Sequence, residues 1–183
     1  MESARAEVTP EITQSGRANP WLFWGVIVVV VAIDVITKWA AVYGLVPEYT
    51  PHEIVGEFVR FTLTYNPGAA FGLNVGSASR WIFTVLTVVA LGVLWSLYRS
   101  TREGDYIRTL ALGLVSAGAV GNLIDRIRWS RGVVDFIDIG IGQHRFWTFN
   151  VADSAVTVGA ILLGLVLLQQ DRVEARAAAT GDV

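Results

Sequence analysis

The chain has 183 residues, of which 53% are hydrophobic and 16% are charged, whereas an average soluble domain carries about 25% charged residues. This composition excludes a disordered or collagen-like chain, and the apolar residues are too clustered to form the core of one water-soluble domain. The formal net charge of −2 provides no basic surface for nucleic acid, so we expect no nucleic-acid partner.

The reactive side chains are few in kind. The absence of cysteine excludes disulfides, a thiolate nucleophile and cysteine-ligated metals. The two histidines, His52 and His144, argue against a histidine-rich metal site. We therefore expect no metal and no cofactor, and any chemistry must be carried by carboxylates, hydroxyls and amides.

Four apolar segments follow a polar start. Residues 1–20 contain Pro10 and Pro20 and predict a disordered tail, and the first apolar run is too long for the apolar region of a signal peptide. Because about 20 helical residues cross a bilayer, the segments are predicted to be transmembrane helices. They comprise Trp21–Val46, Trp81–Tyr98, Tyr106–Ile124 and Ser154–Gln170.

Each span has its own pattern. Asp34 and Lys38 interrupt the first with opposite charges at i,i+4, where they can form an ion pair. Trp81 and Trp95 lie near the two ends of the second, as in an aromatic belt. The third is rich in small residues, which allow close helix packing.

The number of spans places both termini on one side of the membrane. Arg99, Arg102 and Arg108 crowd into the loop between the second and third spans, which the positive-inside rule makes cytoplasmic. Both tails, 1–20 and 171–183, are then cytoplasmic as well. An opposing signal comes from arginines in the last outside connection, namely Arg126, Arg128, Arg131 and Arg145.

The two long outside connections, 47–80 and 133–149, show strand patterns. Phe61, Leu63 and Tyr65 alternate with threonines, and segments 133–139 and 146–149 flank a turn with two glycines. The fold predicted for residues 21–170 is therefore an all-α membrane protein. It is a four-helix transmembrane bundle with a small extracytoplasmic β-cradle, and loop 66–80 with Gly68, Gly72 and Gly76 is predicted to act as a mobile lid.

Polar residues gather at the outer ends of the spans, where ionisable groups are costly and hence candidates for function. The acids near apolar segments are Asp34, Asp125, Asp135, Asp138 and Asp153. Two adjacent carboxylates share one proton, so one can activate a water while the other polarises a peptide carbonyl. Asparagine amides are suited to orient a substrate or to stabilise developing charge.

Five motifs in order carry a resemblance to a known family. They are Asp34…Lys38, Asn66-Pro67-Gly68-Ala69-Ala70-Phe71, Gly121-Asn122-Leu123-Ile124-Asp125-Arg126, Val133-Val134-Asp135-Phe136-Ile137-Asp138 and Phe149-Asn150-Val151-Ala152-Asp153-Ser154. Together they resemble the lipoprotein signal peptidases (signal peptidase II), which are bacterial intramembrane aspartic proteases, over residues 21–170. The resemblance makes Asp135 and Asp153 the catalytic dyad. Positions around the active site and in its polar support are implied for Asn66, Gly68, Asn122, Arg126, Asn150, Asp125, Asp34 and Lys38.

The resemblance also implies a substrate and a location. The substrate would be a prolipoprotein whose cysteine carries diacylglycerol, cut on the N-terminal side of that cysteine. The enzyme would be a monomer in the bacterial inner membrane, in contact with membrane lipid, with its active site near the outer leaflet. Inhibition by globomycin-type cyclic peptides is a further implication. Two positions depart from the family pattern: Trp147 replaces a common proline, and Ala117 a common glycine.

Other readings remain open from the residues alone. Asp153 or Ser154 would suit the N-cap of the fourth helix. Asp138 competes with Asp135, and Asp125 with Arg126 could form a structural salt bridge, while Arg126 is equally suited to the substrate backbone or a lipid headgroup. For the whole protein, a proton-coupled transporter using Asp34 and Lys38 and a non-catalytic lipid-binding subunit are the alternatives.

Overall fold

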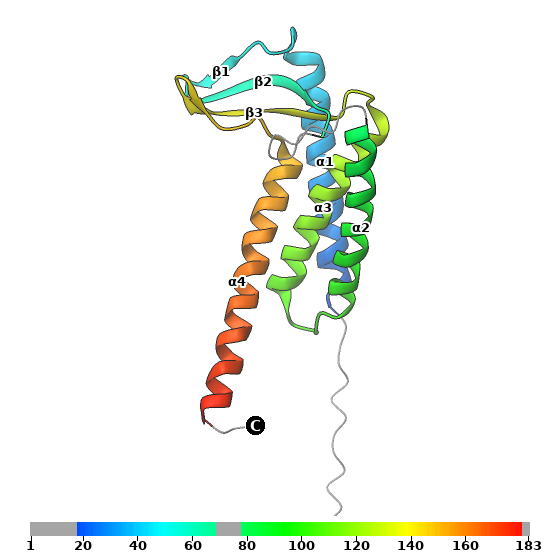
Figure 1. Cartoon of the computed structure of the whole chain (residues 1–183), viewed down its shortest axis with the longest axis vertical. Coiled ribbons are helices and arrows are strands. Elements are labelled where there is room, and N and C mark those ends of the chain that lie inside the picture. The colour runs from blue at the N-terminus through cyan, green and yellow to red at the C-terminus, as the bar shows by residue number, and fades with distance from the viewer. Residues whose placement is uncertain (1–17, 69–77, 181–183) are drawn as a thin grey trace, which may run out of the picture.

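The computed structural model describes residues 18–68 and 78–180, and it contains four long helices and a small sheet (Figure 1). The helices are α1 (Pro20–Gly44), α2 (Ser79–Arg99), α3 (Tyr106–Arg128) and α4 (Val151–Thr180). The strands are β1 (His52–Val55), β2 (Val59–Asn66), β3 (Val133–Ile141) and β4 (His144–Arg145). The predicted fold class is confirmed.

All four helices are long and apolar enough to cross a membrane, and α3 is the central one. It packs against α1, α2 and α4. In the most apolar stretch of α3, 50% of the residues are buried, compared with 6% in that of α2. Helix α3 therefore lies inside the bundle, while the outer helices expose apolar side chains where lipid would lie.

Small residues let α3 and α4 approach closely, as the composition of the third span predicts. A Cβ atom on Gly118 would lie 2.2 Å from the carbonyl oxygen of Ala152, and one on Gly159 would lie 2.8 Å from that of Ala111. A Cβ on Gly121 would lie 2.5 Å from Oδ2 of Asp34. The packing of α1, α3 and α4 thus requires the absence of side chains at these positions.

The sheet is antiparallel throughout, in the order β1-β2-β3-β4, and lies across one end of the bundle (Figure 1). Strands β2 and β3 are the predicted ones, while β1 has no counterpart in the prediction. The prediction of a strand at 146–149 is wrong in its bounds. Strand β4 is His144–Arg145, and Phe149 makes only an isolated bridge to Ile137. The chain must leave the ladder there, because it turns into α4 at Val151.

The first residues of α1 and the last residues of α4 lie at the end of the bundle remote from the sheet (Figure 1). Helix α1 begins at Pro20, where the Asn19 side chain accepts the N–H of Leu22 at 3.1 Å. Helix α4 continues to Thr180, into the segment expected as the second tail. Residues 1–17, 69–77 and 181–183, which include most of the predicted tail and lid, lie outside the described residues.

Candidate active site

The polar residues predicted from the motifs converge where the ends of α1, α3 and α4 meet β3. Asp135, on β3, is 3% exposed. Its Oδ1 accepts a hydrogen bond from Nδ2 of Asn150 at 2.7 Å, and the side chain of Asn66 at the end of β2 also bonds to it. Asn66 is held in turn by the N–H of Gly68, which donates to its Oδ1 at 3.0 Å.

Asp153 lies in the first turn of α4 and has a partner for each carboxylate oxygen. Nδ2 of Asn122 donates to Oδ1 at 2.8 Å, and the backbone N–H of Asn150 donates to Oδ2 at 3.2 Å. The N–H of Asp153 donates back to Oδ1 of Asn150 at 2.9 Å. This reciprocal pattern is a capping box, so Asn150 is the N-cap and the reading of Asp153 or Ser154 as the cap is wrong.

Asn150 connects the two aspartates. It is completely buried, and its amide nitrogen contacts Asp135, Oδ1 of Asn122 at 3.1 Å and the carbonyl of Val134 at 3.2 Å. Its backbone N–H donates to the Asp153 carboxylate, and its side-chain oxygen accepts the N–H of Asp153. One residue at a helix N-terminus therefore contacts both carboxylates, the one on the sheet through its side-chain amide and the one on the helix through its backbone N–H.

The two carboxylates occupy unequal environments. Burial, followed by the negative charge of Asp153, raises the pKa of Asp135 to about 7, although hydrogen bonds from Asn150 and Asn66 and the charge of Lys38 oppose the rise. Asp153 instead lies in the first turn of α4, where each of its carboxylate oxygens accepts a hydrogen bond. The environment of Asp135 therefore favours its protonated form.

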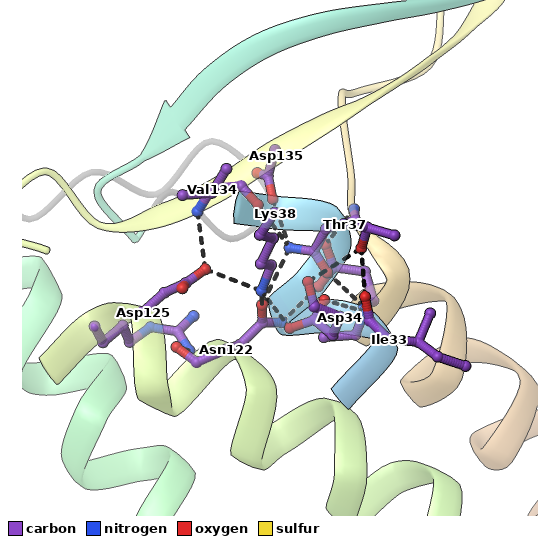
Figure 2. A network of polar contacts seen from close by, with 12 residues as sticks. Ile33, Asp34, Thr37, Lys38, Asn122, Asp125, Val134 and Asp135 are labelled. Carbon is purple, nitrogen blue, oxygen red and sulfur yellow. Dashed lines mark hydrogen bonds and ion pairs between the residues drawn. The ribbon is translucent and has the colours of Figure 1, made fainter. Parts of the chain in front are cut away.

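Lys38 is the centre of a second cluster directly below the first (Figure 2). Its Nζ lies 2.8 Å from Asp34 Oδ2, 2.9 Å from Asp125 Oδ2 and 3.0 Å from Asn122 Oδ1. The three N–H donors of the ammonium group thus meet three acceptors. The predicted pair of Asp34 and Lys38 is present, and Asp125 joins it.

The two carboxylates of this cluster also bind the backbone of the active-site elements. Oδ1 of Asp34 accepts the N–H of Ala152 in α4 at 2.9 Å, and Oδ2 of Asp125 accepts the N–H of Val134 in β3 at 3.1 Å. Ala152 precedes Asp153 and Val134 precedes Asp135. The cluster therefore positions both aspartates through the residues before them. These two backbone donors were not predicted, because backbone groups carry no signal in the sequence.

Arg126 borders the site without pairing with Asp125. Its Nη1 donates to the carbonyl of Asn122 at 3.3 Å, and its guanidinium lies 5.9 Å from the ring centroid of Phe83. Its Nε is buried and finds no acceptor among the described residues. The predicted alternative of a salt bridge between Asp125 and Arg126 is wrong, since the Asp125 carboxylate is engaged by Lys38.

Asp138, the alternative to Asp135 as the reactive acid, is bound by other side chains. Its carboxylate lies 3.3 Å from Nε of Arg60 and 2.5 Å from Nε of Arg145, and Thr62 Oγ1 donates to it at 3.2 Å. Asp138 is three positions after Asp135 in β3, so the alternation of the strand directs the two side chains to opposite faces. The geometry favours Asp135 as the reactive acid.

Two supporting features escaped the sequence reasoning. Arg131 forms a bidentate ion pair with Glu48 and stacks 4.0 Å from the ring centroid of Tyr65. Gly132 adopts φ +105°, and a Cβ atom there would lie 2.1 Å from the carbonyl oxygen of Asn66. A glycine directly before Val133 was a usable signal for the tight turn, whereas the Glu48 contact spans too much sequence to be foreseen.

The ten predicted site residues thus form one contiguous network around Asn122 and Asn150. Within residues 18–68 and 78–180, no three acidic or histidine side chains are grouped as metal ligands would be. The contacts present are those of a carboxylate pair held by amides, backed by a neutralised lysine cluster.

Comparison with known proteins is consistent with this geometry. The family model described as signal peptidase (SPase) II matches residues 26–169. A lipoprotein signal peptidase of Burkholderia thailandensis is 39% identical over 82% of this chain and 89% of its own length. One of Xanthomonas campestris pv. campestris is 40% identical over 82% of this chain and 92% of its own. A bacterial membrane enzyme solved by the in meso method at 2.3 Å resolution superposes with a TM-score of 0.75 at 31% identity, covering 85% of this chain and 92% of that one. The chain therefore belongs to the signal peptidase II family.

Proposed function

We propose that the chain is an aspartic endopeptidase that cleaves diacylglyceryl-modified prolipoproteins with Asp135 and Asp153. Membership of the family already makes it a peptidase that removes signal peptides from prolipoproteins. The observation that supports the aspartic mechanism is the position of Asn150. Its side-chain amide donates to Asp135, a buried carboxyl of raised pKa, and its backbone N–H donates to the Asp153 carboxylate at a helix N-terminus.

The proposed reaction uses one shared proton. Asp153, ionised, takes a proton from a water, and the resulting hydroxide attacks the scissile carbonyl carbon. Asp135 gives its proton to the carbonyl oxygen, which yields a neutral tetrahedral diol. Asp153 then returns its proton to the leaving amide nitrogen while Asp135 recovers a proton from a hydroxyl, and the C–N bond breaks.

The neighbouring groups support these roles. Asn66 and Asn150 hold Asp135 in place, and both oxygens of Asp153 are oriented by Asn122 and Asn150. Arg126, whose Nε has no acceptor among the described residues, is suited to bind a substrate carbonyl or a lipid phosphate.

The position of the site suits a lipidated substrate. The aspartates lie at the sheet end of the apolar helices, where a diacylglyceryl anchor would hold a cysteine at headgroup level. We propose cleavage on the N-terminal side of that cysteine, by a monomer in the bacterial inner membrane, with both termini cytoplasmic and the site near the outer leaflet. Sensitivity to globomycin-type cyclic peptides and closure of the site by loop 66–80 belong to the same proposal.

The decisive experiment is cleavage of a diacylglyceryl-modified prolipoprotein by the purified chain in lipid vesicles. We expect cleavage that requires the lipid and is abolished in Asp135→Asn and in Asp153→Asn. Asp138→Asn, a buried aspartate on the same strand, is the matched control and should retain activity if it folds. Cleavage that survives in either dyad variant would overturn the assignment. A folded wild type that cuts nothing and conducts protons would favour the transporter.

A further inference from the structure

Residues of α4 and of the loop that joins α2 to α3 line a cleft. These segments lie at the end of the bundle remote from the sheet (Figure 1). Its volume is about 680 Å³, in the range of sites for small organic ligands. Polar side chains line most of it: Arg102, Asp105, Arg108, Gln169 and Gln170. The proposed peptidase mechanism uses none of them.

The two arginines of this cleft, Arg102 and Arg108, form no ion pair within the described part of the chain. By contrast, three arginines of the sheet end, Arg60, Arg131 and Arg145, each form one. Nε of Arg108 is buried and finds no acceptor in the described part of the chain. The one acid in the wall, Asp105, uses its Oδ1 to cap α3 by accepting the N–H of Arg108 at 3.1 Å. The charged side chains of the wall, Arg102, Arg108 and Asp105, carry a net charge of +1, which favours an anionic ligand.

The cleft lies at the depth of lipid headgroups. Helix α2 ends at Arg99, α3 begins at Tyr106, and the apolar window of α4 ends at Arg172, so all three spans reach the membrane surface here. Ile107 and Val166 add apolar wall beside the arginines. A ligand with a phosphate and a hydrocarbon portion matches both kinds of lining.

We propose that this cleft binds the phosphate of an anionic phospholipid in the leaflet on this side, which the positive-inside rule makes the cytoplasmic one. Arg102 and Arg108 bind the phosphate oxygens, and the amides of Gln169 and Gln170 are placed to donate to the headgroup. Since the start of a signal peptide is positively charged, the arginines disfavour it as an occupant. The bound lipid would tie α4 to the loop between α2 and α3.

The test measures thermal unfolding of the full-length chain in detergent micelles with phosphatidylglycerol or phosphatidylcholine of the same acyl chains. Phosphatidylglycerol should raise the midpoint by several degrees more than phosphatidylcholine. Combining Arg102→Gln with Arg108→Gln should remove at least half of that difference, and Arg108→Lys should retain more of it than Arg108→Gln. The matched control is Arg99→Gln at the same end, since Arg99 lies over the ring of Trp95 and does not line the cleft.

Two results would overturn the proposal. An equal loss in Arg99→Gln would mean that lipid is attracted by the general positive charge of this end. Inorganic phosphate that stabilises as much as phosphatidylglycerol would make the ligand a free anion. If the double variant does not fold, Arg102→Gln is tested alone, because Arg102 is exposed on the loop. A response of this variant to phosphatidylglycerol equal to that of the wild type would contradict the site.

Discussion

Asp135 and Asp153, the proposed catalytic pair, illustrate how two identical side chains can occupy different environments. Asp135 is enclosed by β3 and by amides, so burial penalises its charged form, while Asp153 faces the N–H groups of a helix end. Hydrogen bonds from asparagines hold both acids in place, and the asparagines donate without adding charge.

The pH dependence of cleavage should reflect this division. Because Asp135 must be protonated to act as the acid and burial raises its pKa to about 7, kcat/KM should fall about tenfold per pH unit above that value. The hydrogen bond from Asn66 lowers this pKa, so Asn66→Ala should move the alkaline limb to higher pH. Profiles of kcat/KM between pH 5 and 9 for the wild type and for Asn66→Ala check this. An unchanged limb in Asn66→Ala would show that another group sets it.

Lys38 is the residue on which the supporting cluster depends. It neutralises Asp34 and Asp125, which are both almost completely buried. Lys38→Met should therefore destabilise the protein by roughly 3–5 kcal/mol, because it leaves two buried carboxylates without a cation. Unfolding in denaturant measures the loss, and adding Asp34→Asn and Asp125→Asn should recover part of it. A single variant as stable as the wild type would contradict the role.

At the scale of elements, the contact of α3 with α4 depends on glycine. Gly118→Ala would place a methyl group 2.2 Å from the carbonyl oxygen of Ala152, so the helices must separate where α4 carries Asp153. We expect a destabilisation of about 1–3 kcal/mol and a loss of cleavage. Gly164→Ala is the control, since it lies in α4 with nothing within 4 Å and should be neutral or slightly stabilising. Equal behaviour of the two variants in thermal unfolding would refute the packing argument.

For the whole molecule, the orientation in the membrane can be tested directly because the chain has no cysteine. Glu57→Cys, on the exposed turn between β1 and β2, should react with a membrane-impermeant maleimide added to intact cells. Glu103→Cys, in the exposed loop between α2 and α3, should react only after the membrane is permeabilised. The reverse pattern would invert the proposed topology and place the aspartates on the cytoplasmic side.

Much of the fold follows from the sequence because its signals are local. Long uncharged runs predict helices that cross a membrane, and the alternation around Phe61 and Leu63 predicts β2. β1 and the true extent of β4 escaped prediction, since pairing with a neighbouring strand defines them more than their own residues do.

The site divides in the same way. The sequence by itself determined the kinds of group available, namely carboxylates and amides without thiols, and the motif order that identifies Asp135 and Asp153. Only the tertiary structure decided that Asn150 contacts both aspartates and that Lys38 binds Asp125 as well as Asp34. It also decided that Arg60 and Arg145 form ion pairs with Asp138. The physical reason is distance along the chain: Lys38 and Asn122 are 84 residues apart, and only the packing of α1 against α3 brings them within 3.0 Å.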